Sequence, residues 1–225
     1  MSRFFSADSA LMRALDRLAD VIILNLVFIA TSLPLLTLGA SLTALHSVSR
    51  ALVGGRLEDS VARAYLRAFR ANLRDGSRLL AAIAGLVAVL VAWFGVIEYL
   101  VVDPLAQLLM FAVWFVLAIQ VTTTAIVAFP YLATFDDATA RVLRNALLMS
   151  WRHPLAALCA FTVTALPVVI TVFYPKVTGY GVVWLVAGFA AIAVVTTLLF
   201  TRIFAQYTPA AAAAPSTEEP VRAHS

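Results

Sequence analysis

The residues of this chain that could do chemistry are few and widely spaced. There are three histidines, His46, His153 and His224, and a single cysteine, Cys159. No HExxH zinc motif, Walker phosphate-binding loop or GxSxG nucleophile elbow is present. Ser41 and His46 are five residues apart, about 140° around a helix axis, so they do not face each other as a nucleophile and base would. We therefore expect no catalytic residue, cofactor or metal site, and a protein that is not an enzyme.

A second group of polar residues lies within an apolar region near the N-terminus. The candidate intramembrane polar cluster comprises Asn25, Thr37, Thr43 and His46. Histidine ordinarily titrates near neutral pH, so a proton relay through His46 is one interpretation. The interpretation that we favour is structural, because such side chains commonly bond back along their own helix or across to a neighbour.

A third pattern lies in residues 59–76, which read as an amphipathic cytoplasmic helix. At 100° per residue, Tyr65 and Phe69 fall on an apolar face bordered by arginines. Asp59 is the expected N-cap and Gly76 the expected stop. The helix either lies in the membrane plane with its arginines at anionic headgroups, or packs on the bundle with its arginines solvated. The candidate anionic-lipid contacts are Arg63, Arg67, Arg70 and Arg74.

Composition assigns the whole chain to the membrane. Of its 225 residues, 63% are apolar and 12% charged, and the mean hydropathy is +0.96. A soluble domain is roughly half apolar and about a quarter charged. The net charge of +4 does not indicate nucleic-acid binding, because the basic residues flank apolar runs and no nucleic-acid motif accompanies them.

The apolar runs predict an all-α fold, a polytopic transmembrane helical bundle in one domain spanning residues 1–204. Residues 79–97 and 155–174 are each free of charge and long enough to cross about 30 Å of hydrocarbon. The predicted spans are 9–33, 35–53, 79–99, 105–130, 155–174 and 180–203. Residues 205–225 are rich in alanine, proline and polar residues and predict a disordered cytoplasmic tail.

The first apolar region allows two topologies. A single helix through Pro34 gives five spans and an external N-terminus, whereas a turn at residues 34–39 gives two helices, six spans and an internal N-terminus. The positive-inside rule favours six spans, because all the arginines then lie on one side. In both topologies residues 50–78 and 141–152 are cytoplasmic, as is the C-terminus.

Several short motifs resemble one family. They are Asn25-Leu26, Ser32-Leu33-Pro34, Thr37-x-Gly39-Ala40, Thr43-Ala44-Leu45, Val48-x-Arg50, Gly55-Arg56-Leu57-Glu58-Asp59 and Phe69-x-x-Asn72-Leu73. This pattern resembles the YesL family of bacterial membrane proteins, a domain of unknown function. Ala40-Ser41 stands where many members have Pro-Ala, and the resemblance is densest over residues 25–72.

The resemblance implies a multi-pass protein of the bacterial cytoplasmic membrane. Family members are often encoded near carbohydrate ABC transporters, so it also implies an accessory or scaffold protein linked to sugar uptake. The expected partners are the lipid bilayer, anionic lipids and a sugar ABC-transporter permease. The alternative is a small-solute secondary transporter acting alone. The sequence gives no indication of homo-oligomer formation.

Overall fold

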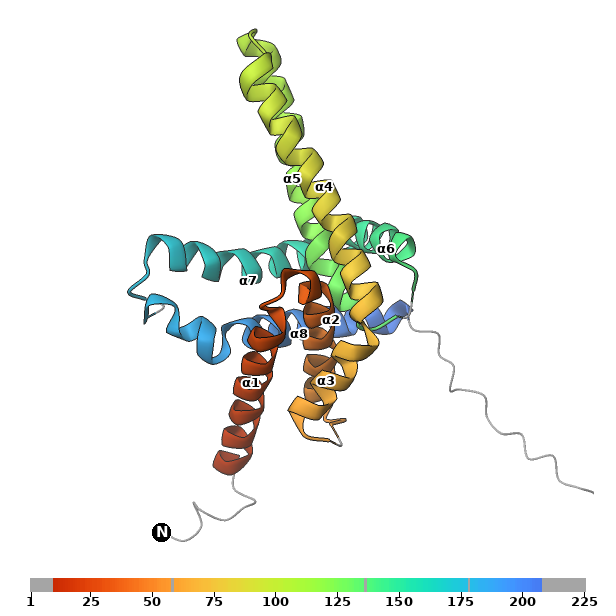
Figure 1. The fold of residues 1–225 in the computed structure, drawn as a ribbon, viewed down its shortest axis with the longest axis vertical. Coiled ribbons are helices and arrows are strands. Elements are labelled where there is room, and N and C mark those ends of the chain that lie inside the picture. Colours follow the sequence, from red (N-terminus) through yellow and green to blue (C-terminus); the bar gives the residue numbers. More distant parts are fainter. Residues whose placement is uncertain (1–9, 58, 136, 178, 208–225) are drawn as a thin grey trace, which may run out of the picture.

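The computed structural model describes residues 10–57, 59–135, 137–177 and 179–207, and this part of the chain is helical with no strand (Figure 1). The predicted all-α class is therefore confirmed. The elements are α1 (Ala10–Ser32), η2 (Leu35–Thr37), α2 (Leu38–Val53), α3 (Val61–Ala71), α4 (Leu73–Leu100), α5 (Pro104–Leu132), α6 (Thr139–Arg152), α7 (Pro154–Phe173), η3 (Gly179–Gly181), η4 (Trp184–Gly188) and α8 (Phe189–Tyr207).

Four helical stretches among the described residues are long and apolar enough to cross a membrane. They are α4, α5, α7 and the stretch Trp184–Thr201, which consists of η4 and the first part of α8. The chain is thus a membrane protein. A helix also lies in each of the two other predicted spans, but α2 has only 16 residues, and charged residues lie in the first half of α1. The choice between five and six crossings stays a prediction.

The turn at Pro34 separates α1 from α2. Proline has no N–H to continue the helix, and its backbone is extended, with φ −76° and ψ 114°. The Thr37 hydroxyl donates to the carbonyls of Thr31 and Pro34, both at 2.8 Å, which holds the turn closed. A single helix running through Pro34 therefore does not occur.

The helix predicted over residues 59–76 is shorter than expected. It ends at Ala71, and α4 begins at Leu73 after a one-residue break at Asn72, whose side-chain amide donates to the Ala68 carbonyl at 2.8 Å. The prediction was therefore wrong about Gly76, which lies inside α4, and Arg74 belongs to α4 as well. Asp59 does not cap α3 either: Ser60 is at the N-cap position, and the Asp59 carboxylate pairs with Arg67.

Gly76 is needed for a close crossing of α4 with α2. A Cβ on Gly76 would lie 2.8 Å from the Cα of Ala40, and one on Gly39 would collide with the Gly76 carbonyl oxygen. Small residues let helix backbones approach closely in membranes, where packing drives helix association. This crossing places α2 at the centre of the fold, in contact with α1, α3, α4, α5 and α8.

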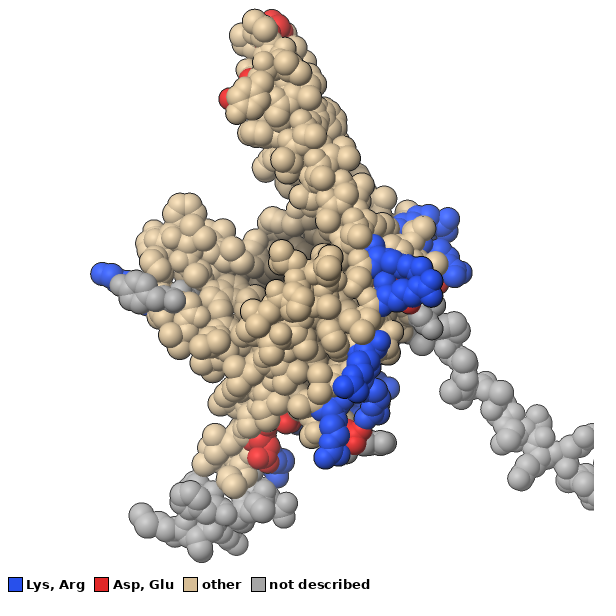
Figure 2. All heavy atoms as spheres, viewed as in Figure 1, with Lys and Arg blue, Asp and Glu red and all other residues tan. Residues whose placement is uncertain are grey.

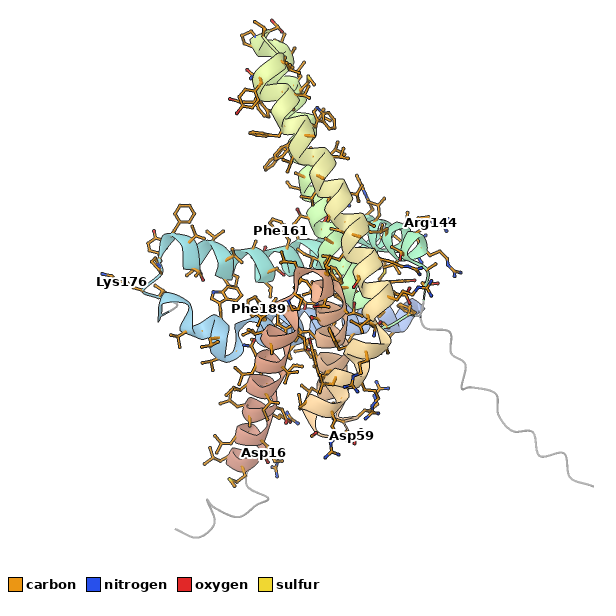
Figure 3. All side chains as sticks on the ribbon, in the orientation of Figure 1. Asp16, Asp59, Arg144, Phe161, Lys176 and Phe189 are labelled. Carbon is orange, nitrogen blue, oxygen red and sulfur yellow. The ribbon has the colours of Figure 1, made fainter. Side chains whose placement is uncertain are left out.

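The two long hairpins leave this centre in different directions (Figure 1). The α4–α5 hairpin projects on its own and is held by its internal contacts: the Trp114 indole donates to the Leu90 carbonyl at 2.8 Å, and Phe94 packs on Phe111 and Trp114. The other hairpin consists of α7, η4 and α8, and it extends in a direction roughly crosswise to the α4–α5 hairpin (Figure 1). Lys176 lies at the far end of this second hairpin, on the opposite side of the molecule from Arg144 (Figure 3).

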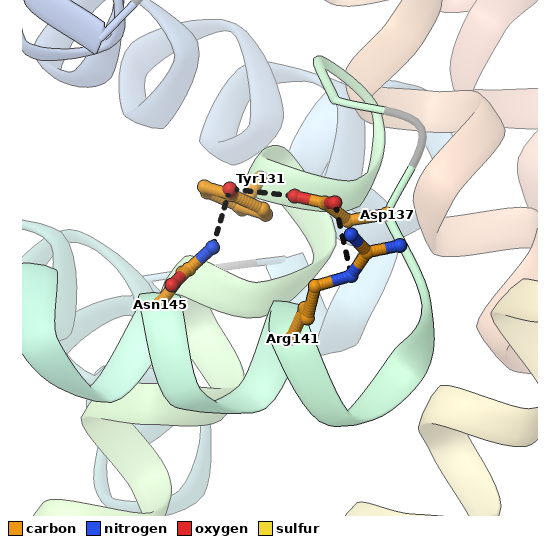
Figure 4. A network of polar contacts seen from close by, with 4 residues as sticks. All are labelled: Tyr131, Asp137, Arg141 and Asn145. Carbon is orange, nitrogen blue, oxygen red and sulfur yellow. Dashed lines mark hydrogen bonds and ion pairs between the residues drawn. The ribbon is translucent and has the colours of Figure 1, made fainter.

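A polar network joins the end of α5 to α6 (Figure 4). The Tyr131 hydroxyl donates to Asp137 at 2.9 Å and accepts from the Asn145 amide at 2.8 Å. Arg141 pairs with the same aspartate at 3.4 Å. The network fixes α6 against the base of the α4–α5 hairpin.

Arginines gather on one side of the molecule, away from Lys176 (Figure 2 and Figure 3). Figure 2 shows them over α3, the start of α4 and α6, whereas acidic residues mark the tip of the α4–α5 hairpin. The positive-inside rule assigns the first of these regions to the cytoplasm. The predicted tail lies outside the described residues from residue 208 onward, and α8 extends through residues 205–207.

Candidate functional site

An apolar cavity of about 510 Å³ lies where the two hairpins meet α1 and α2. Phe161 of α7 and Phe189 of α8 are close to the centre of the molecule (Figure 3), and both line it. The other lining residues are Phe28, Leu42, Leu45, His46, Thr122, Ala125, Ile126, Phe129, Thr164, Ala165, Val168, Val169, Trp184, Ile192, Ala193 and Thr196. The volume falls within the roughly 300–1,000 Å³ typical of small-molecule sites.

A second cavity of about 270 Å³ contains two arginines, Arg50 and Arg56, and is called the basic cavity here. It is also lined by His46, Val53, Gly54, Pro130, Thr134, Thr197, Phe200, Thr201, Phe204 and Ala205. None of these lining residues is acidic. Within the described part of the chain, no carboxylate forms an ion pair with Arg50 or Arg56. The basic cavity therefore offers cationic donors that can bind an anion.

His46 belongs to the lining of both cavities. Its Nδ1 atom is buried and has no hydrogen-bond partner among the described residues. A buried polar atom without a partner is costly, so such an atom marks a position where a ligand or a water molecule would be stabilising. His46 is thus the predicted polar residue whose surroundings leave room for a functional role.

Asn25 is buried and fully engaged in structural bonds. Its amide nitrogen donates to the carbonyls of Trp184 at 2.9 Å and Leu185 at 2.8 Å, and its oxygen accepts from the Ala190 N–H at 3.1 Å. The two carbonyls belong to the π-helical segment η4, where the ordinary helical bonding is interrupted, and the N–H belongs to the start of α8. Asn25 therefore joins α1 to the cavity wall at η4 and α8.

The predicted polar residues do not form one cluster. Thr37 closes the turn at Pro34, and Thr43 donates to the Gly39 carbonyl of its own helix at 2.9 Å. The bonded group that does form joins three helices through Tyr65, whose hydroxyl lies 2.6 Å from the Thr31 hydroxyl and donates to the Ser41 carbonyl at 3.3 Å. Burial raises the pKa of Tyr65, which keeps this hydroxyl protonated.

The apolar face of α3 packs on the bundle. Val61 and Tyr65 are buried among residues of α1 and α2, and Phe69 packs beside them. This is the second of the two arrangements considered for the amphipathic helix. The four candidate lipid contacts, Arg63, Arg67, Arg70 and Arg74, are all exposed, and their binding of lipid stays a prediction.

Comparison with known families places this centre of the fold in a described domain. Residues 21–94 match the family model described as "Protein of unknown function, DUF624". The chain is similar to this family over that segment. The match agrees with the predicted resemblance to a family of unknown function. Searches of the curated proteins and of the solved structures gave no significant match.

The segment that matches this model, called the DUF624 segment here, covers α2 and α3, the second half of α1 and most of α4. It therefore includes Asn25, His46, Arg50 and Arg56, together with the crossing of α2 and α4. The remaining walls of both cavities come from α5, α7, η4 and α8, which follow the DUF624 segment in the chain. The cavities are thus completed only by the whole bundle.

The sequence pattern indicates only a topological role for Arg50 and Arg56 and does not show that they line a cavity. One signal was available, since Arg50 follows His46 by four residues and so lies on the same face of α2. Nothing local identifies Trp184 as the partner of Asn25, because 159 residues separate them.

Proposed function

We propose that this chain is a non-catalytic accessory or scaffold protein of the bacterial cytoplasmic membrane, associated with the permease of a carbohydrate ABC transporter. The observation that supports it most is the α4–α5 hairpin, which projects from the rest of the fold (Figure 1). None of the residues in the most apolar 18-residue stretch of α5 is buried within the chain. The sides of this hairpin are free to contact lipid or another membrane helix.

The side chains on this hairpin suit a helix–helix contact within the bilayer. Val91 of α4 and Leu109 and Val116 of α5 are each 60–64% exposed. Helices associate in lipid through van der Waals packing between complementary shapes. The family resemblance supplies the class of partner, a sugar permease.

Co-purification tests this function. The tagged chain, expressed at natural level in its own host and extracted in mild detergent, should retain a stoichiometric permease subunit. Replacing Leu109 and Val116 by alanine should reduce that recovery several-fold while the chain stays in the membrane. The matched control replaces Val172 and Leu198, equally apolar and exposed residues on the other hairpin, and should leave recovery unchanged.

A liposome experiment separates this role from transport by the chain alone. Vesicles containing only this protein should show no saturable uptake of sugars or other small solutes. Saturable uptake by these vesicles, together with no permease in the purified complex, would replace the scaffold function by the transporter alternative.

A further inference from the structure

The two cavities are stacked along the same three helices. On α2, Leu42 and Leu45 line the apolar cavity and Arg50 lines the basic cavity, with His46 in both. On α5, residues between 122 and 129 line the apolar cavity, and Pro130, with Thr134 just after the helix, lines the basic cavity. On α8, residues 192–196 line the apolar cavity and residues between 197 and 205 line the basic cavity. Each helix therefore leads from an apolar space to a cationic one.

We propose that these cavities bind one anionic membrane lipid, with an acyl chain in the apolar cavity and the acidic headgroup at Arg50 and Arg56. An acyl chain suits the apolar cavity because it has no polar groups that the cavity would leave unpaired. Guanidinium groups bind phosphate through paired, charge-assisted hydrogen bonds. The order of the linings along the helices matches the order of these two parts in a lipid.

The positions of the arginines also fit a lipid headgroup. Arg50 is in the last turn of α2, and Arg56 lies in the loop that follows it. The basic cavity also contacts the ends of α5 and α8 through Thr134 and Ala205. These helix ends are on the side that the positive-inside rule assigns to the cytoplasm, where anionic headgroups of the inner leaflet lie.

The cavity linings are less suited to a sugar or another small polar solute. The hydroxyls of Thr134, Thr196 and Thr201 donate to carbonyls of their own helices. Most of the remaining lining of the apolar cavity is aliphatic or aromatic. A sugar would leave its hydroxyls without partners there, which is costly, whereas an acyl chain would not.

Fluorescence of Trp184, which lines the apolar cavity, provides the test. The full chain is prepared with Trp93→Phe, Trp114→Phe and Trp151→Phe and reconstituted in phosphatidylcholine vesicles. A small fraction of lipid with brominated acyl chains, which quench tryptophan on contact, is then added. Brominated phosphatidylglycerol should quench at a several-fold lower mole fraction than brominated phosphatidylcholine. Equal quenching by the two lipids would overturn the proposal, because it indicates only the general lipid annulus.

Two variants test the two halves of the site, each checked for retained helicity and a monodisperse elution profile. Arg50→Gln with Arg56→Gln should abolish the preference for phosphatidylglycerol, whereas Arg144→Gln with Arg152→Gln, a matched pair outside both cavities, should keep it. Ala165→Leu narrows the apolar cavity. It should raise several-fold the mole fraction of brominated phosphatidylglycerol needed to quench Trp184, although both arginines are intact. A preference that survives the first variant contradicts the headgroup site.

Inorganic phosphate distinguishes a lipid site from a site for a free anion. Millimolar phosphate should displace brominated phosphatidylglycerol only slightly, because the anion lacks the acyl chain. Complete displacement would overturn the lipid assignment in favour of a small anion. If the Arg50→Gln, Arg56→Gln variant does not fold, the comparison of the two lipids and the Ala165→Leu variant still test whether the cavities bind an anionic lipid.

Discussion

Asn25 shows how one polar side chain can stabilise an apolar fold. Its three hydrogen bonds go to backbone groups of η4 and the start of α8. The residue is therefore better described as a structural link between α1 and the last helix than as part of a solute pathway. An asparagine suits this position because its side-chain amide both donates and accepts hydrogen bonds.

Asn25→Leu should destabilise the protein by about 1–3 kcal/mol, since it removes a buried side chain that satisfies two carbonyls and one N–H. Unfolding in detergent, followed by circular dichroism against added denaturant, measures this loss. Thr162→Val is the matched control, because the Thr162 hydroxyl only donates to the Leu158 carbonyl of its own helix. A change for Asn25→Leu no larger than that of the control would contradict the linking role.

Gly39→Ala and Gly85→Ala should act in opposite directions. A Cβ at Gly39 meets the backbone of α4, so the α2–α4 crossing must widen, at a cost of about 1–3 kcal/mol. A Cβ at Gly85 meets nothing within 4 Å, so alanine should stabilise α4 by about 0.5–1 kcal/mol through helix propensity. Thermal unfolding of both variants in the same detergent gives the comparison. Equal shifts of the same sign would show that the crossing is not close-packed.

At the scale of elements, α3 combines a buried apolar face with an exposed arginine stripe. Tyr65 fixes the helix to α1 and α2, so α3 is held at the bundle and its arginines are presented at a set position. Arg67 is the member of the stripe that pairs with Asp59. The others remain available to headgroups.

Replacing Arg63, Arg67, Arg70 and Arg74 together by glutamine should reduce the enrichment of anionic lipid around the protein. Each basic side chain near an anionic surface contributes about 1 kcal/mol, and salt screens this over about 10 Å at 0.1 M. The measurement is the fraction of phosphatidylglycerol retained by the full chain after extraction from mixed bilayers, at low and high salt. Lys176→Gln, at the far end of the other hairpin (Figure 3), should have no effect. Unchanged retention in the fourfold variant would leave the stripe as a topology signal alone.

At the scale of the whole molecule, the arrangement of charge predicts its orientation. Arginines surround α3, the start of α4 and α6, whereas the α4–α5 tip carries acidic residues (Figure 2). The α1–α2 turn makes an internal N-terminus the expectation, because two separate helices can cross and return. Six crossings then follow if both helices span the bilayer.

Cysteine labelling tests this orientation in a Cys159→Ser background. A cysteine at Ser2 should react with an impermeant thiol reagent only after the cells are permeabilised. A cysteine at Val102, beside the hairpin tip and 93% exposed, should react in intact cells and serves as the positive control. Reaction at Ser2 in intact cells would place the N-terminus outside and support five crossings.

The sequence was sufficient for those features that depend on local composition. Apolar runs located the long helices, and Pro34 with Thr37 located the turn between α1 and α2. It was insufficient where a residue acts through a distant partner. In sequence, Gly76 resembles a helix stop, because its contact with Gly39 arises only when α2 and α4 pack together. Likewise, His46 lines both cavities only when α5 and α8 are in place.

The bond between Asn25 and η4 also has a consequence for how the protein is made. A ribosome adding about 5–20 residues per second produces Trp184 roughly 8–30 s after Asn25, since 159 residues separate them. During that interval α1 can be inserted, but its buried amide lacks its native partners. The N-terminal helices therefore complete their packing only when the last hairpin arrives, and a nascent chain stalled before residue 184 would present an unpaired asparagine to the proteases that survey the membrane.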